Sequence, residues 1–189
     1  FATSIEMPVG RDKQYDIPLI DIAHERERQV VVDREAGQYL GHPTTVLLED
    51  GRTMLAVYPK GHGRGGIVYK RSTDAGLTWS DRLPVPESWV GSKEVPTMYR
   101  VTDASGKKRL IMFSGLYPIR MAVSEDDGVS WSELNDIGDY GGIVATSDMI
   151  QRSDGNYLTQ FHDDGRFLRN SGEWTGKFEV FSILSNDGG

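Results

Sequence analysis

The chain has 189 residues, of which 38% are hydrophobic and 26% are charged, so it is long enough and apolar enough for one ordinary globular core. Its formal net charge of −7 argues against a protein that grips nucleic acid or an anionic membrane, since both tasks need clustered Lys and Arg. The sequence has no cysteine, which excludes disulfides and thiolate chemistry, and no apolar run near the roughly 20 residues that cross a bilayer.

Residues 1–37 precede the first repeated unit, and we expect them to form an N-terminal extension or a closing strand. The chain begins with Phe1 rather than Met, from which we expect that a leader has been removed.

Three similar units follow along the chain, at 44–72, 97–124 and 148–185. Each contains an apolar run, a turn with Gly, a second apolar run and then a third run that leads into a polar motif. Short β-rich runs separated by Gly and Asp turns are hairpin signals, and no segment has a convincing period of 3.6 residues. The sequence therefore predicts an all-β repeat protein.

Each third run ends in a motif of the form Ser-x-Asp-x-Gly-x-x-Trp, and the last copy stops at its Gly. The Asp carboxylate is expected to accept hydrogen bonds from N–H groups of its own turn, while the Gly adopts a positive φ and the Trp packs between units. These roles are structural rather than catalytic. The motif residues are Ser72, Asp74, Gly76 and Trp79; Ser124, Asp126, Gly128 and Trp131; and Ser185, Asp187 and Gly189.

This motif resembles the Asp box of bacterial neuraminidase repeats, and the stretch 67–80 resembles the corresponding stretch of sialidases. The resemblance covers residues 38–189 and implies a β-propeller with four-stranded antiparallel blades, six-bladed when complete. About three blades fit in this chain, which we interpret as the N-terminal half of a longer propeller. The resemblance also implies a bacterial protein that is secreted or periplasmic. If the chain is half a ring, its open blade edges predict self-association.

Strands of a blade alternate in direction, so the loops that lead into the first strand and join the second to the third share one face. The Asp-box turns lie on the opposite face. On the loop face we predict catalytic roles for His62, Glu94, Asp148, His162 and Asp163, since imidazoles and carboxylates can act as acids and bases. We predict substrate-binding roles for His42, Lys60, Arg64, Tyr117, Arg120 and Arg166, mostly as anchors for an anionic sugar.

Neither a metal nor another cofactor is expected. The His-Asp-Asp-Gly stretch at 162–165 lacks a second His at ligand spacing, and adjacent turn residues rarely converge on one ion. His24 lies outside these loops and has no predicted role.

Sialidases resemble one another in an Arg-Ile-Pro stretch that leads into the first blade and in an acid/base Asp on the loop after the next strand. Here Pro43 matches, but Gly41 stands at the Arg position with His42 beside it, and the loop 60–66 has no carboxylate. The sequence therefore predicts a sialidase-like glycoside hydrolase with an altered active site, acting from chain ends on acidic sugars of glycans. Two alternatives stay open: a non-catalytic carbohydrate-binding propeller and a propeller polysaccharide lyase.

Overall fold

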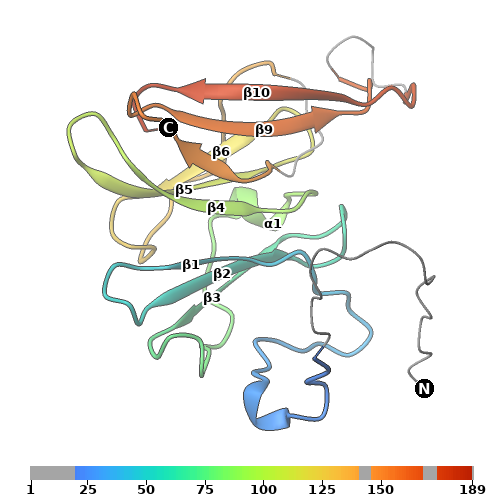
Figure 1. Ribbon diagram of the computed structural model, residues 1–189. Helices are drawn as coiled ribbons and strands as arrows, with labels where there is room; N and C mark the ends of the chain where they lie inside the picture. Colours follow the sequence, from blue (N-terminus) through green and yellow to red (C-terminus); the bar gives the residue numbers. More distant parts are fainter. Residues whose placement is uncertain (1–19, 141–145, 168–173, 189) are drawn as a thin grey trace, which may run out of the picture.

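The computed structural model describes residues 20–140, 146–167 and 174–188. They form three antiparallel sheets that follow one another along the chain (Figure 1). The first sheet has the order β1-β2-β3, the second β4-β5-β6-β7, and the third β10-β9-β8. None of the helices in these ranges is long and apolar enough to cross a membrane.

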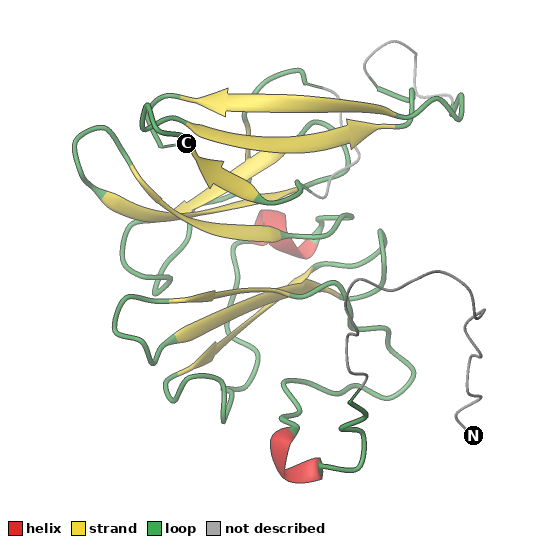
Figure 2. Cartoon of the chain, in the orientation of Figure 1, coloured by secondary structure: helices red, strands yellow, loops and turns green. Residues whose placement is uncertain are grey.

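The first sheet contains β1 (Thr44–Leu47), β2 (Met54–Pro59) and β3 (Ile67–Ser72), and it is followed by the short helix α1 (Glu87–Val90). The second contains β4 (Thr97–Thr102), β5 (Lys108–Ser114), β6 (Arg120–Ser124) and β7 (Asn135–Asp136). The third contains β8 (Met149–Gln151), β9 (Tyr157–Asp163) and β10 (Glu179–Ser185). A 3-10 turn, η1 (Arg26–Arg28), precedes them all. The cartoon in Figure 2 shows that strands dominate and helices are brief.

The predicted hairpin turns are confirmed. The β1–β2 turn has Gly51 at a φ of 66°, and the Asp50 carboxylate accepts hydrogen bonds from the backbone N–H groups of Arg52 and Thr53 at 2.9 and 2.8 Å. The turns β4–β5 and β8–β9 use Gly106 and Gly155 in the same positive-φ region. Each turn fixes the register of its hairpin, and the register decides which side chains of each strand point into a core.

Regular fourth strands are fewer than the sequence predicts, since among the described residues only the second sheet has one. After β3 the chain still runs beside that strand, because Ser80 N and Leu83 N donate to the carbonyls of Arg71 and Tyr69, both at 2.9 Å. Pro84 follows directly and has no N–H to continue such pairing. The first sheet therefore has an irregular outer edge in place of a fourth strand.

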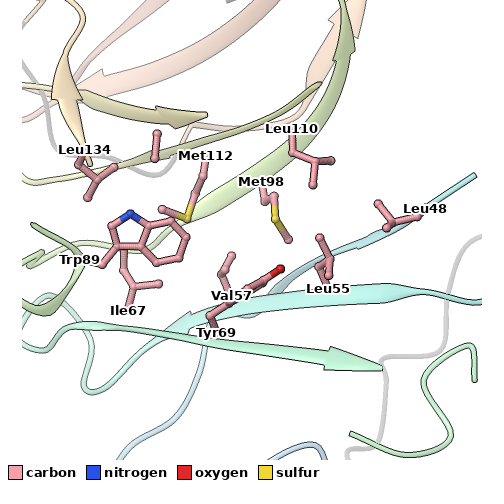
Figure 3. Packing of buried hydrophobic residues seen from close by; sticks show 11 residues of the cluster. Leu48, Leu55, Val57, Ile67, Tyr69, Trp89, Met98, Leu110, Met112 and Leu134 are labelled. Carbon is pink, nitrogen blue, oxygen red and sulfur yellow. The ribbon is translucent and has the colours of Figure 1, made fainter. Parts of the chain in front are cut away.

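Two hydrophobic clusters hold the sheets together, one on each side of the second sheet. On β5, Leu110 and Met112 belong to the cluster shared with the first sheet, whereas Ile111 and Phe113 belong to the cluster shared with the third. This alternation explains why residues 110–113 of β5 form an unbroken apolar run, since both faces are buried there. Figure 3 shows the first cluster, in which Trp89 of α1 lies among side chains from both sheets.

The Asp boxes act as turn clamps, as predicted. Asp74 accepts hydrogen bonds from Thr78 N at 2.8 Å, from Thr78 Oγ1 at 2.6 Å and from Ser72 Oγ at 2.7 Å. Asp126 repeats this pattern with Ser124 and Ser130. These bonds, each to a carboxylate, hold the pKa of both Asp side chains below the usual range.

Among the remaining box residues, the glycines have the predicted positive φ and Trp131 has the predicted packing between sheets. Gly76 and Gly128 have φ values of 89° and 76°. Trp131 is half-buried between the first two sheets, with its ring edge-on to Tyr69 at 6.2 Å between centroids. Trp79 is also half-buried, and its Nε1 donates to the Gly76 carbonyl at 3.0 Å.

The third box is present where the structure describes it. Ser185 Oγ lies 2.8 Å from Asp187 Oδ1, as in the other two boxes. The predicted Gly189 lies outside the described residues.

The described part of the extension lies along the first sheet. Lys70 Nζ, on β3, donates to the Val32 carbonyl at 2.6 Å, and Tyr58 Oη, on β2, donates to Asp33 Oδ2 at 2.6 Å. The closing strand stays a prediction, because residues 1–19 lie outside the described ranges.

Candidate functional site

One end of the three sheets carries the loops that contain the predicted catalytic and substrate-binding residues. The segments before β1, β4 and β8, and the β2–β3, β5–β6 and β9–β10 connections, lie at this end because neighbouring strands are antiparallel. In Figure 1 the end of β9 and the start of β10 lie on the right, while the β1–β2 and β4–β5 turns lie on the left. The Asp boxes follow β3 and β6 and belong to the opposite end.

Three rings from the first sheet's loops form a cluster. The imidazoles of His42 and His62 are stacked with centroids 4.6 Å apart, and Tyr39 Oη forms a 3.0 Å hydrogen bond with His42 Nδ1. His42 has a φ of 51°, a conformation that is uncommon for a residue other than glycine. These contacts fix both histidines although their side chains are exposed.

The loop 60–66 passes close to the second sheet because it is rich in glycine. A Cβ added at Gly63, whose φ is 65°, would lie 3.8 Å from Glu94 Oε2. A Cβ at Gly66 would lie only 2.6 Å from the carbonyl oxygen of Val90, the last residue of α1. The glycines therefore let the backbone beside His62 approach the loop that carries Glu94.

Glu94 is a buried carboxylate at this end whose pKa is shifted by its surroundings. The residue is only 8% exposed, and this burial raises the pKa of its carboxyl group above the usual range. A hydrogen bond from Val95 N and the positive charges of three neighbours act in the opposite direction. Those neighbours are His62 from the first sheet and His162 and Arg166 from the third. Glu94 thus lies within electrostatic reach of groups on both flanking sheets.

A buried pair of serines holds the loop of Glu94. Ser92 Oγ and Ser114 Oγ are 2.6 Å apart, and Ser114 Oγ also donates to the Glu94 carbonyl at 3.1 Å. Both residues are almost fully buried, and because Ser114 Oγ donates to the Glu94 carbonyl, it accepts the hydrogen bond that the Ser92 hydroxyl donates. The sequence did not single out these serines, since nothing local distinguishes a buried serine at a strand end from an exposed one.

The third sheet contributes charged groups from the end of β9. Asp163 is buried and accepts a 2.5 Å hydrogen bond from Gly165 N. Arg166 Nε lies 2.9 Å from Oδ1 of the buried Asp164, which orients the guanidinium. His162 directly precedes Asp163 on β9, and the centroid of its ring lies 5.9 Å from that of Phe178.

An aromatic pair joins the second and third sheets at the same end. Tyr117, between β5 and β6, stacks on Phe167 with ring centroids 4.8 Å apart and an angle of 3° between the planes. The Arg166 guanidinium carbon lies 5.1 Å from the centroid of Phe167. Tyr117 was predicted to bind substrate, and Phe167 completes its surroundings.

Four predicted residues lie around this cluster, and three of them have partners of their own. Lys60 Nζ pairs with Glu35 Oε2 at 3.1 Å, and Arg120 Nε pairs with Asp136 Oδ1 at 3.4 Å. Asp148 is exposed; its carboxylate accepts a hydrogen bond from Met149 N. Arg64 is exposed and lines a shallow hollow together with His62 and Tyr39.

The structure therefore brings a subset of the predicted residues together. The subset comprises His42, His62, Glu94, His162, Arg166 and Tyr117. Lys60, Arg120 and Asp148 lie toward its margins, and Asp163 follows His162 at the end of β9. Within the described residues, no group of three or more His, Asp or Glu side chains is arranged to hold a metal ion.

Comparison with known proteins supports the predicted fold. No protein-family model matches the sequence. A sialidase of Clostridium perfringens is 25% identical over 145 residues, which are 62% of this chain and 38% of that protein. The intramolecular trans-sialidase of Ruminococcus gnavus, solved with oseltamivir carboxylate, superposes with a TM-score of 0.54 at 17% identity, over 83% of this chain and 35% of that one. The chain has a sialidase-like fold.

A second propeller enzyme shares this sialidase-like fold. The α-L-arabinanase of Penicillium chrysogenum, solved with arabinobiose, superposes with a TM-score of 0.53 at 19% identity, over 78% of this chain and 46% of that one. The chain therefore spans less than half the length of each of these three proteins. The fold class predicted from the Asp boxes is confirmed.

Proposed function

We propose that the protein is a sialidase-like glycoside hydrolase that removes acidic sugars from glycans with an altered set of catalytic groups. The observation that carries the proposal is the surroundings of Glu94. A buried carboxyl group with a raised pKa stays protonated at a higher pH than an ordinary glutamate, as a general acid requires. Its neighbours His62, His162 and Arg166 supply bases and positive charge on both sides.

In the proposed reaction, the Glu94 carboxyl group donates its proton to the glycosidic oxygen as the bond from this oxygen to the anomeric carbon breaks. A water molecule attacks the anomeric carbon, and His62 accepts the proton that this water loses. The products are a free acidic sugar and the shortened glycan. Glu94 regains a proton from solvent and His62 releases one, so the cycle closes.

Binding of the acidic sugar needs local cations, because the chain as a whole carries a net charge of −7. Arg166 is oriented by Asp164 beside Glu94, and Arg64 is exposed beside His62. We assign both to the sugar carboxylate. This assignment replaces the arginine that sialidases carry where this chain has Gly41, so anion binding depends on different loops.

The test is turnover by the full-length protein. Methyl and 4-methylumbelliferyl glycosides of sialic acid, glucuronic acid and arabinofuranose cover acidic and neutral sugars. We expect hydrolysis of an acidic glycoside. Glu94→Gln keeps the shape of the side chain but removes its proton, and it should lower kcat by roughly 10²- to 10⁴-fold. The matched control is Glu125→Gln, an exposed carboxylate in the second Asp-box turn that pairs with Lys107.

Other outcomes of these assays would support one of the two alternative functions, a polysaccharide lyase or a non-catalytic binding propeller. An unsaturated sugar product would identify a polysaccharide lyase, and glycan binding with no product would identify a binding propeller. Equal turnover by wild type and Glu94→Gln would refute the role of Glu94, whatever the substrate.

A further inference from the structure

The Tyr117–Phe167 pair has features that neither the acid nor the anion anchors require. Its two rings come from different sheets, one from the β5–β6 connection and one from the residues after β9. They are parallel to within 3° and 4.8 Å apart between centroids. Two loops that belong to separate blades therefore meet through flat apolar surfaces at the end that carries Glu94.

Tyr117 is held on one face and at its tip. Phe167 covers the first face, and Tyr117 Oη donates to Asp139 Oδ1 at 2.7 Å. The residue nevertheless keeps 39% of its surface exposed. The exposed area must therefore lie on the opposite face and along the ring edge, which leaves a flat and orientationally fixed apolar surface toward solvent.

The pair adjoins the proposed acid. Arg166 lies over Phe167, with its guanidinium carbon 5.1 Å from the ring centroid, and the same guanidinium is within electrostatic reach of Glu94. Asp164 fixes that guanidinium through a 2.9 Å ion pair. A chain of neighbours thus leads from Glu94 through Arg166 and Phe167 to Tyr117. These neighbours come from the second and third sheets, whereas His62 comes from the first.

We propose that the open face of Tyr117 is a stacking platform for the neutral sugar that adjoins the acidic sugar on the leaving side of the bond. This inference rests on the proposed hydrolysis. An uncharged aromatic face suits the C–H surface of a neutral pyranose, whereas the acidic sugar needs the cations beside Glu94. Phe167 acts through Tyr117, because it backs the ring and keeps its plane fixed.

A purely structural pair would hold the two loops together without contacting substrate. The dependence of turnover on substrate length distinguishes such a pair from a stacking platform. The first probe is the methyl glycoside of sialic acid, whose leaving group is too small to reach a platform. The second is sialyl-lactose, in which the same acidic sugar is linked to a neutral disaccharide. The measured quantity is the ratio of kcat/KM for sialyl-lactose to kcat/KM for the methyl glycoside, using full-length protein.

We expect Tyr117→Ala to lower this ratio about fivefold to tenfold, and Tyr117→Phe to keep it within about twofold because the ring remains. Phe167→Leu should lower it by a smaller factor. A Tyr117→Ala protein that turns over both probes with an unchanged ratio would overturn the platform and leave the proposed hydrolysis standing.

A protein that hydrolyses neither of these probes nor any other acidic glycoside would overturn the proposed function instead. The platform is then tested by calorimetric titration of wild type and Tyr117→Ala with sialyl-lactose and with lactose. Weakening of either affinity by about fivefold or more in Tyr117→Ala supports the platform. Equal affinities, or no binding by wild type, refute it. Thermal melts of each variant confirm that the compared proteins are folded.

Discussion

Replacing Trp89 by Ala should destabilise the chain more than other single changes in the loops, because α1 places this ring in the core between the first two sheets. The side chain is fully buried, and its ring packs edge-on against Trp131 at 5.4 Å and Tyr69 at 6.1 Å between centroids. A buried Trp hides about 150–250 Å², and at about 25 cal/mol/Å² this corresponds to about 4–6 kcal/mol. The residual structure of unfolded chains reduces the figure, so we expect about 3–5 kcal/mol.

The assay is urea unfolding followed by circular dichroism, with melting temperature as a second readout. For a chain of this size each kcal/mol corresponds to roughly 2–4 °C, so Trp89→Ala should melt about 6–20 °C lower. Trp89→Phe should cost less, about 1–2 kcal/mol, because no described residue accepts a hydrogen bond from Trp89 Nε1 and its loss leaves no partner unpaired. The control Trp174→Ala removes a ring that is 67% exposed and should change stability by less than about 0.5 kcal/mol. A Trp89→Ala protein within about 1 kcal/mol of wild type would refute the assignment of α1 to the core.

Two further predictions concern polar groups. Ser124→Ala removes the buried hydroxyl that accepts the Gly128 N–H at 2.9 Å, and it should lower the free energy of unfolding by about 1–3 kcal/mol, whereas Ser153→Ala in an exposed turn should have little effect in the same urea titrations. Glu94→Gln should stabilise the protein at neutral pH, because the raised pKa of Glu94 means that folding disfavours its ionised form. The wild-type chain has the full stability of this group below pH 4.5, the ordinary value, and loses it as pH rises through the folded pKa; a stabilisation by Gln that grew toward acid pH would contradict this sign.

The repeated pattern was enough to predict the sheets and the Asp-box turns. A hairpin with a Gly turn and a Ser-Asp-Gly clamp depends on residues within a few positions of one another. The hydrogen bonds of Asp74 and Asp126 could therefore be predicted from the neighbouring sequence. Pairing beyond the hairpin is harder to predict, and the irregular outer edge of the first sheet depends on Pro84, whose effect competes with the general blade pattern.

The loop face was predictable as a face, but its internal grouping was not. Alternating strand direction places His62, Glu94 and His162 at one end from topology alone. Whether an ionisable side chain meets an unusual environment depends on three-dimensional contacts. Lys60 and Glu94 look alike in sequence as loop charges, yet Lys60 pairs with Glu35 whereas Glu94 is buried among groups from two sheets.

The partner of Lys60 shows that the N-terminal extension helps to position the loops of the site. Glu35 Oε2 binds Lys60 Nζ at 3.1 Å and Arg82 Nη1 at 2.6 Å, and these bonds lower the pKa of Glu35. One residue beyond Lys60, Gly61 N donates to the Tyr39 carbonyl at 2.9 Å, and Tyr39 in turn binds His42. Glu35 of the extension thus holds the start of the loop 60–66, and Tyr39, which lies between the extension and β1, contacts both that loop and His42. It follows that the position of His62 relative to Glu94 depends on residues before the first strand. The sequence analysis predicts no site role for these residues.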